Sequence, residues 1–219
     1  MVKLSASINP CIESQAVEYS KELQIAGTDY LHLDVMRSNF VPNNMLNINT
    51  IFEIADNTLL PLDCHLMVNE PLSILPEYLK LKLNYITVHY EAFSNKQDML
   101  KAFKMIRDTH SLAGISIKPN TFVKEIVEYL PYVDMVVIMG VEPGFSGQKM
   151  ISNTIPKVKE LHDIIVKEGY NIKIEVDGGV NEKNMKELYK AGADILVMGS
   201  RLFNAPNKTN FIKEVHAVK

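Results

Sequence analysis

The sequence predicts a single domain over residues 1–219 with the α/β fold of a (β/α)8 barrel, the TIM-barrel architecture. Two observations support this prediction. Strand-like and helix-like segments alternate along the whole chain, as in barrels in which every strand is followed by a helix. A length of 219 residues suits one such barrel, and no linker, low-complexity tract or block of like charges marks a domain boundary.

The expected strands are short apolar segments bounded by turn residues. In chain order they are residues 4–9, 30–36, 61–68, 85–90, 113–118, 134–141, 173–177 and 195–199. Segment 134–141 is an unbroken apolar run, which is typical of a strand buried on both faces of a parallel sheet. Two four-residue segments of similar sequence each mark the end of a helix and the start of a strand: Ala26–Asp29 and Ala191–Asp194. They form a weak internal repeat.

An expected helix follows most of these strands. In chain order the helices are residues 13–26, 50–57, 71–81, 95–109, 122–130, 152–168 and 182–191, and residues 211–218 close the chain. The first helix shows apolar residues at a spacing near 3.6, and Gly27 marks its end. A polar loop, 37–49, separates the second strand from the second helix.

The composition is ordinary for a globular protein, with 47% hydrophobic and 22% charged residues. A net charge of −3 offers no basic face for nucleic acid. No apolar run reaches the roughly 18 residues of a membrane span, and the N-terminus has no signal-peptide core. Cys11 and Cys64 are the only cysteines, which is no disulfide framework. We therefore expect a cytoplasmic protein that binds neither nucleic acid nor membrane.

The candidate site begins with the strand 30–36. Side chains alternate along a strand, so His32 and Asp34 share one face of an otherwise apolar segment. The third strand carries His65 in the same alternation, and the seventh ends on Asp177. In a barrel the reactive groups stand at the carboxyl ends of the strands. These four side chains suit one Zn²⁺ ion, and their nitrogen and oxygen donors would also accept Fe²⁺, Mn²⁺ or Co²⁺.

The last three loops after strands predict a phosphate site. Small residues there allow backbone N–H groups to approach an anion closely. They occur in Gly144–Gly147, in Gly178-Gly179 and in Gly199-Ser200, and phosphate binds in these loops of many barrels.

A metal ion beside two aspartates and a phosphate site indicates chemistry on a phosphorylated sugar. The ion would polarise a carbonyl and stabilise an enediolate, while one carboxylate removes the neighbouring proton and the other returns one. Carboxylates on opposite faces of the enediolate would invert the carbon. This epimerisation needs no organic cofactor.

Eight ordered motifs resemble the ribulose-phosphate 3-epimerase family from the first strand to the eighth. They are Ser5–Ile8, Leu31–Met36, Phe40–Asn43, Leu62–Val68, Ile86–Ala92, Val141–Gln148, Glu175–Val180 and Gly199-Ser200. The resemblance implies an isomerase of the pentose phosphate pathway that interconverts D-ribulose 5-phosphate and D-xylulose 5-phosphate. It also implies the phosphate site of ribulose-phosphate-binding barrels, and barrels of this family often form homo-oligomers.

The resemblance further assigns residue roles. It implies metal ligation by His32, Asp34, His65 and Asp177, with Asp34 and Asp177 as proton acceptor and donor that exchange roles with direction. Substrate contacts are implied for Ser7, His65, Met36, Met67, Met139, Gly144, Phe145, Ser146, Gly147, Asp177, Gly178, Gly179, Gly199 and Ser200. The three methionines would shield the enediolate face, although they are also ordinary core residues.

Two departures from the family pattern leave the sugar open. The family usually has Asp-Gly where this chain has Arg37-Ser38, and Thr or Ser where it has Gly140. Both changes are expected near the mouth of the pocket, so D-allulose 6-phosphate is the alternative substrate. Related decarboxylases carry a lysine where this chain has His65, which argues against them. A paralogue that binds sugar phosphate without turnover would lack one or more of the metal-binding or acid–base residues, and this chain has all four.

Further polar residues accompany the site. Asp63 and Glu175 are expected one layer below the ligands, and one of them is expected to accept the N–H of a ligand histidine, although both are also compatible with satisfied core carboxylates. His89 is expected to pack as a wall of the pocket. The remaining histidines, His110, His162 and His216, are expected in solvent.

Overall fold

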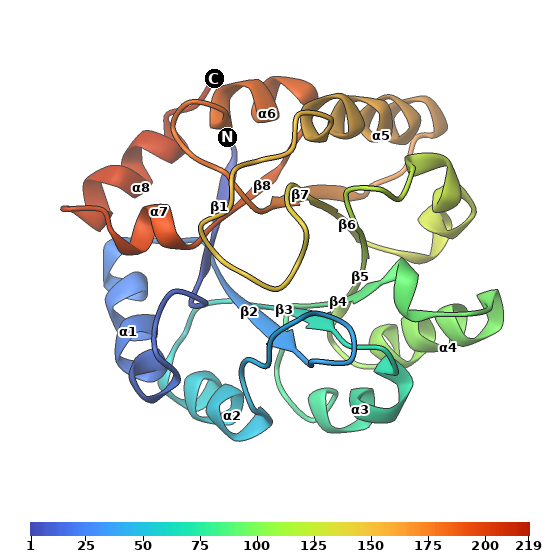
Figure 1. Cartoon of the computed structure of the whole chain (residues 1–219), viewed down its shortest axis with the longest axis horizontal. Helices are drawn as coiled ribbons and strands as arrows, with labels where there is room; N and C mark the ends of the chain where they lie inside the picture. The colour runs from blue at the N-terminus through green and yellow to red at the C-terminus, as the bar shows by residue number, and fades with distance from the viewer.

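The structure is a computed structural model that describes residues 1–219, and eight parallel strands form a closed barrel at its centre (Figure 1). They are β1 (Lys3–Ser7), β2 (Tyr30–Met36), β3 (Leu62–Met67), β4 (Tyr85–His89), β5 (Leu112–Ile117), β6 (Met135–Met139), β7 (Lys173–Asp177) and β8 (Ile195–Met198). The strands pair in chain order and β8 pairs with β1, so the predicted barrel is confirmed.

Helices surround the barrel (Figure 1). They are α1 (Ala16–Ala26), α2 (Ile48–Asn57), α3 (Pro71–Tyr78), α4 (Lys96–Arg107), α5 (Thr154–Glu168), α6 (Met185–Ala191), α7 (Ser200–Phe203) and α8 (Lys208–His216). Four 3-10 segments complete the chain: η1 (Glu13–Gln15), η2 (Tyr90–Ala92), η3 (Val123–Glu125) and η4 (Val127–Tyr132). None of the helices combines the length and the apolarity that crossing a bilayer requires.

The helix expected at residues 122–130 is wrong. The chain instead forms η3 and η4, two 3-10 segments separated at Ile126, where φ is −107° and ψ is −3°. Pro131 lies inside η4 and has no N–H to donate, and proline disfavours helical geometry at the residue before it. A regular α-helix therefore does not extend through this segment.

The expectation of a solvated His216 is also wrong. Its Nε2 lies 2.6 Å from Oδ2 of Asp29, a carboxylate that also accepts the N–H of Leu4 at the start of the barrel. His162 is half-buried and lies against Gly192, whereas His110 is exposed as expected. The pairing of His216 joins α8 to the β1–β2 entrance, a contact between residues 187 positions apart.

The strands divide the interior into two environments. Outward-facing residues such as Leu31, Leu33 and Val35 of β2 join an apolar core of 57 buried residues that packs beneath the helices. The alternate residues, including His32 and Asp34, face the inside of the barrel. The register of β2 and β3 sets His32 beside Asp63 and Asp34 beside His65. Alternation along two paired strands thus gathers the polar groups inside the barrel.

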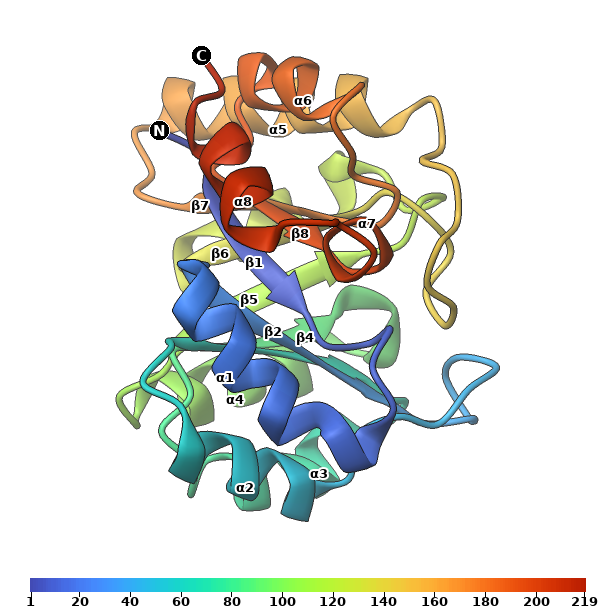
Figure 2. The same ribbon diagram turned by 90° about the vertical axis from the view of Figure 1, so that its left-hand side faces the viewer.

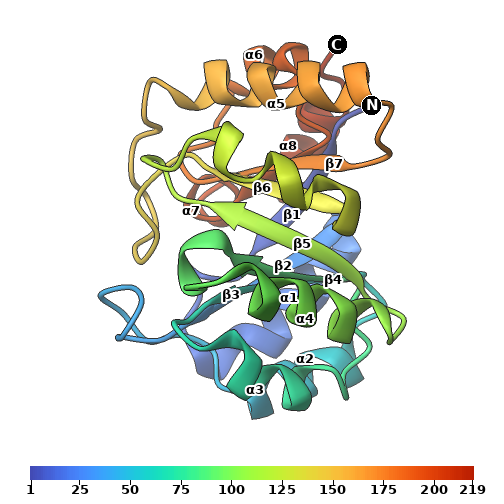
Figure 3. The ribbon, with the colours of Figure 1, turned by 90° about the vertical axis from the view of Figure 1, so that its right-hand side faces the viewer.

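Two long loops extend from the same end of the barrel. The β2–α2 loop and the β6–α5 loop project together on one side in Figures 2 and 3. This is the end at which the strands terminate, where barrel enzymes carry their active sites. Backbone bonds in both directions between Met36 and Met45 hold the base of the β2–α2 loop as an antiparallel bridge.

Candidate metal and substrate site

The four expected ligands converge at the carboxyl end of the barrel. His32 and Asp34 come from β2, His65 from β3 and Asp177 from the end of β7. Nε2 of His32 lies 3.2 Å from Oδ1 of Asp34, and Nδ1 of His65 lies 3.7 Å from the same oxygen and 3.8 Å from Oδ2 of Asp177. The four ligand atoms all lie within 4.8 Å of one another.

These donor atoms fit a divalent metal ion. Nε2 of His32, Oδ1 of Asp34 and Nδ1 of His65 are buried and have no hydrogen-bond partner. Buried polar atoms are nearly always hydrogen-bonded, so three buried polar atoms that lie close together without a partner need an explanation. Two imidazole nitrogens and two carboxylate oxygens form a ligand set that Zn²⁺ and neighbouring transition metals accept. The cluster could therefore hold one metal ion.

Asp63 orients His32. Its Oδ2 lies 2.7 Å from Nδ1 of His32 and also accepts a hydrogen bond from Oγ of Ser5 at 2.9 Å. The expected contact between a buried carboxylate and a histidine of the candidate ligand set is thus present at Asp63. Burial disfavours the charged imidazole, but the charges of Asp63 and Asp34 outweigh it and hold the pKa of His32 well above its ordinary value.

Glu175 has a different environment. Its carboxyl group is fully buried, and neither oxygen has a hydrogen-bond partner. Burial and then the charge of Asp63 raise the pKa of Glu175 well above its ordinary value. Glu175 thus lies below the ligands as expected, but the N–H of His32 is closer to Asp63.

His89 was expected to form a wall of the pocket, but it is not among the residues that line the cavity and it contacts His65 instead. It is fully buried, and its Nε2 lies 2.9 Å from Nε2 of His65. On its other side, Nδ1 of His89 lies 3.0 Å from Oε2 of Glu91. Sequence reasoning missed Glu91, although the His-x-Glu spacing at the end of β4 was the available signal.

The two candidate catalytic carboxyl groups differ in their proton affinity. At Asp34 burial acts to raise the pKa, but the charge of His32 and a 3.1 Å hydrogen bond from Oγ of Ser7 lower it below its ordinary value. At Asp177 burial and then the charge of Asp34 raise the pKa to about 7. Paired carboxyl groups with separated pKa values suit a base and an acid.

A cavity of about 360 Å³ opens above the ligands. Every residue expected to touch substrate lines it except His65. The lining comprises Ser7, Asp34, Met36, Met67, Met139, Gly144, Phe145, Ser146, Gly147, Asp177, Gly178, Gly179, Gly199 and Ser200. Sequence reasoning missed Asn9, Gln148, Asn181, Arg201 and Asn204, which also line it.

The glycine-rich loops offer free N–H groups to this cavity. The N–H groups of Gly147, Gly178, Gly179 and Gly199 donate to no other backbone or side-chain group of the protein. Gly179 has a φ of 70°, and a Cβ there would lie 2.4 Å from the backbone nitrogen of Met150. A side chain would therefore displace the backbone that forms the cradle.

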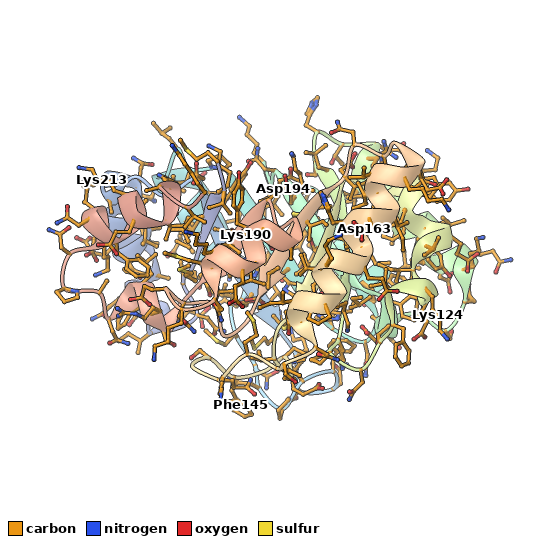
Figure 4. The ribbon with its side chains drawn as sticks, turned by 90° about the horizontal axis from the view of Figure 1, so that it is seen from above. Lys124, Phe145, Asp163, Lys190, Asp194 and Lys213 are labelled. Atoms are coloured by element: carbon orange, nitrogen blue, oxygen red, sulfur yellow. The ribbon has the colours of Figure 1, made fainter.

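The aromatic ring of Phe145 marks the outer rim of the cavity. It belongs to the β6–α5 loop and is 58% exposed. Figure 4 shows it at the edge of the molecule, away from Asp194, which directly precedes β8. The cavity thus opens to solvent at this end of the barrel.

Arg37 was expected near the mouth of the pocket, and the structure places its guanidinium at the base of a loop instead. Arg37 does not line the cavity. Its Nη1 donates to the carbonyls of Met36 and Met45 at 2.8 and 3.2 Å, so the guanidinium fastens the base of the β2–α2 loop. Because Met36 faces the cavity, strand alternation turns Arg37 to the other side. Gly140 also lies outside the lining, where a Cβ would lie 2.3 Å from the carbonyl oxygen of Gly178.

Comparison with known proteins yields one family. The sequence profile of the ribulose-phosphate 3 epimerase family matches residues 3–203. The ribulose-phosphate 3-epimerase of Bacillus subtilis is 33% identical over 220 residues, which cover 100% of both chains. The enzyme of the same name from Aquifex aeolicus is 37% identical over 82% of this chain and 79% of that protein. The chloroplastic enzyme of Arabidopsis thaliana is 36% identical over 92% and 72%.

Solved structures with low sequence identity share the fold. A 3-hexulose-6-phosphate synthase superposes with a TM-score of 0.71 at 15% identity and covers 99% of both chains. The N-acetylmannosamine-6-phosphate 2-epimerase of Clostridium perfringens gives a TM-score of 0.67 at 15% identity, over 99% of this chain and 93% of that one. At this identity the likeness shows the barrel alone.

Proposed function

The chain belongs to the ribulose-phosphate 3-epimerase family, and we propose that it interconverts D-ribulose 5-phosphate and D-xylulose 5-phosphate by inverting carbon 3. One observation carries this proposal. The carboxyl groups of Asp34 and Asp177 line the same cavity as the glycine loops, whose N–H groups have no partner within the protein. A phosphorylated ketose is the substrate class that uses both features.

The two aspartates reach the cavity from different sides. Asp34 stands on β2 and Asp177 on β7, and β1 and β8 separate these strands in the closed sheet. A planar enediolate between them would present one face to each carboxyl group. In one direction Asp34 accepts the proton from carbon 3 and Asp177 donates a proton to the opposite face, and in the other direction the roles exchange.

The neighbours of the aspartates support these roles. Against the effect of burial, the charge of His32 lowers the pKa of Asp34, and Ser7 donates a hydrogen bond to its Oδ2 and so orients the carboxylate. Burial and then the charge of Asp34 raise the pKa of Asp177 to about 7, which suits a group that exchanges a proton with the substrate. Asp63 holds the ring of His32 in place below. A general acid and a general base arranged in this way each contribute about 10²- to 10⁴-fold to a rate.

We propose that His32, Asp34, His65 and Asp177 hold one Zn²⁺ ion. When bound, the ion supplies Lewis acidity that polarises the substrate carbonyl and stabilises negative charge on its oxygens. The three methionines, Met36, Met67 and Met139, line the cavity beside the ligands and exclude water from the reacting carbon. The N–H groups of the glycine loops bind the phosphate dianion.

The proposal predicts a specific isotope pattern. In D₂O the wild-type protein with Zn²⁺ should place deuterium at carbon 3 of both epimers, followed by NMR. Asp34→Asn and Asp177→Asn should each lose about 10²- to 10⁴-fold in epimerisation. Each variant should still exchange the carbon 3 proton of one epimer, because one carboxylate remains. Asp163→Asn on the exposed face of α5 is the matched control and should behave as wild type.

The choice of sugar is tested in the same assay. We expect a higher kcat/KM for D-ribulose 5-phosphate than for D-allulose 6-phosphate, because Arg37 and Gly140 lie outside the cavity lining. A preference for the six-carbon sugar would refute this assignment of substrate and keep the two-aspartate chemistry. Absence of carbon 3 exchange with either sugar would refute the proposed function. A cytoplasmic location and a homo-oligomer remain predictions.

A further inference from the structure

A chain of three side chains leads from the metal site toward the surface. His65 on β3 meets His89 on β4, with 2.9 Å between their Nε2 atoms and stacked rings 4.9 Å apart. Nδ1 of His89 then lies 3.0 Å from Oε2 of Glu91 in η2. Both imidazoles are fully buried, whereas the Glu91 side chain is 20% exposed. This chain is separate from the contact between His32 and Asp63.

The direction of the hydrogen bonds follows from Glu91. Its Oε1 accepts the backbone N–H of Lys118 at 2.7 Å and the hydroxyl of Thr121. Burial opposes ionisation, but the hydrogen bonds from His89, Thr121 and Lys118 outweigh it and lower the pKa of Glu91 to about 2. The Glu91 carboxylate can therefore only accept hydrogen bonds. Nδ1 of His89 must then carry the proton of the hydrogen bond to Oε2 of Glu91.

The remaining protons are then fixed. Two imidazole nitrogens 2.9 Å apart form a hydrogen bond only when one carries a proton and the other a lone pair. With Nδ1 donating to Glu91, the neutral form of His89 has its lone pair on Nε2, which accepts from a protonated Nε2 of His65. His65 consequently presents an unprotonated Nδ1 to Asp34 and Asp177. We propose that His89 and Glu91 are positioning residues that hold His65 in the tautomer with Nδ1 free to bind a metal.

The alternative tautomer shows why this matters. A proton on Nδ1 of His65 would point at the space between Asp34 and Asp177 and would occupy the position of a metal ion. Ligand histidines usually donate their second N–H to an acceptor that fixes the tautomer. For His32 the acceptor is the carboxylate of Asp63. For His65 it is a second imidazole, whose own proton is fixed by Glu91.

The surroundings hold this chain rigidly. Nζ of Lys157, a buried lysine of α5, donates to the carbonyls of Lys118, Pro119 and Thr121 at 3.1, 2.8 and 2.8 Å. The lysine thereby fixes the segment whose N–H and hydroxyl groups orient Glu91. On its other side Glu91 lines a second surface cavity of about 600 Å³, which keeps the carboxylate in contact with solvent.

The tautomer is measured directly on the metal-free protein. Long-range ¹H–¹⁵N correlation of ¹⁵N-histidine-labelled protein should show His65 protonated on Nε2. In Glu91→Gln the amide oxygen is expected to keep the bonds of Oε1, so the amide –NH₂ faces Nδ1 of His89. The protons of His89 and His65 should then shift to the opposite nitrogens. A wild-type His65 protonated on Nδ1, or a Glu91→Gln spectrum unchanged at His65, would overturn the inference.

Metal affinity gives an independent readout. Competition for Zn²⁺ with a chromophoric chelator should show binding weakened about 10- to 100-fold in Glu91→Gln. Glu125→Gln, a change in the neighbouring η3, is the matched control and should bind as wild type. His89→Phe keeps the ring but has no acceptor and should lose affinity, whereas His89→Gln places an amide oxygen near Nε2 and should recover most of it. Equal affinity in all four variants would refute the positioning role.

The inference rests on the proposed function only through the role of His65 as a ligand, and the two can be separated. The tautomer of the metal-free protein requires neither metal nor turnover. An inactive protein with His65 protonated on Nε2 would refute the epimerase assignment and support the positioning role. An active protein with the opposite tautomer would do the reverse.

Discussion

Replacing Asp177 with Asn should stabilise the metal-free protein at neutral and alkaline pH. The Asp177 carboxyl group is 15% exposed and faces Asp34, and burial is the largest cause that raises its pKa from 3.8 to about 7. Asn is isosteric with the protonated acid and never ionises. One pH unit corresponds to about 1.4 kcal/mol, so the ionised Asp177 destabilises the metal-free fold by an upper limit of about 4 kcal/mol.

The sign follows from proton binding in the two states. The folded protein binds the Asp177 proton more tightly than the unfolded chain does, so its relative stability is greatest below pH 3.8 and declines as the pH rises to about 7. Asp177→Asn does not share this decline. The difference in unfolding free energy should therefore grow from about 2 kcal/mol at pH 5 to about 4 kcal/mol at pH 8.

Urea unfolding between pH 5 and pH 8 in the presence of a chelator measures this difference. Asp163→Asn is the control, because Asp163 is an exposed carboxylate on α5 and its loss should change stability by less than about 0.5 kcal/mol. Added Zn²⁺ should reverse the order, since it stabilises the protein that retains Asp177. A variant no more stable than wild type at pH 8, or a difference independent of pH, would refute the reasoning.

Three further substitutions test other parts of the site. Gly179→Ala should raise KM for the sugar phosphate at least about tenfold and cost about 1–3 kcal/mol of stability, because its Cβ meets backbone; Gly169→Ala, with the same φ of 70° and open space around it, should leave KM unchanged. Arg37→Ala should lower the unfolding free energy by about 1–2 kcal/mol without altering the ratio of kcat/KM between five- and six-carbon sugars, and a changed ratio would contradict its outward orientation. Asp63→Asn should weaken Zn²⁺ binding about 10- to 100-fold in chelator competition, and unchanged affinity would show that His32 needs no carboxylate partner.

The predictable part of the molecule is the part that depends on strand alternation. A period of two assigns His32 and Asp34 to one face without knowledge of the fold, and the carboxyl ends of parallel strands meet at one end of a barrel. The ligand cluster therefore followed from the sequence once three such strands were recognised. Asp63 followed for the same reason, because it precedes His65 by two residues.

The sequence-based expectations that failed at the site concern contacts made by loops. Arg37 looked like a new charge at the pocket mouth, but its orientation depends on the bridge between Met36 and Met45, which no local pattern reveals. Glu91 is positioned by Lys118 and Thr121, which lie about 30 residues later in the β5–η3 loop. Such cross-loop hydrogen bonds have no periodicity, so the sequence could indicate the residue types but not their partners.

The polar interior and the apolar shell of the barrel have opposing effects on stability. His32, Asp34, Asp63, His65 and Glu175 are all buried in a space that most barrels fill with branched apolar side chains. Their desolvation is unfavourable, and several of their donor atoms remain unpaired without a metal ion. The apolar core of 57 buried residues between the strands and the helices offsets this unfavourable free energy, because its packing does not depend on the site. This separation lets the barrel keep a destabilising set of buried polar groups where the chemistry requires them, and a bound metal ion should therefore contribute to stability as well as to catalysis.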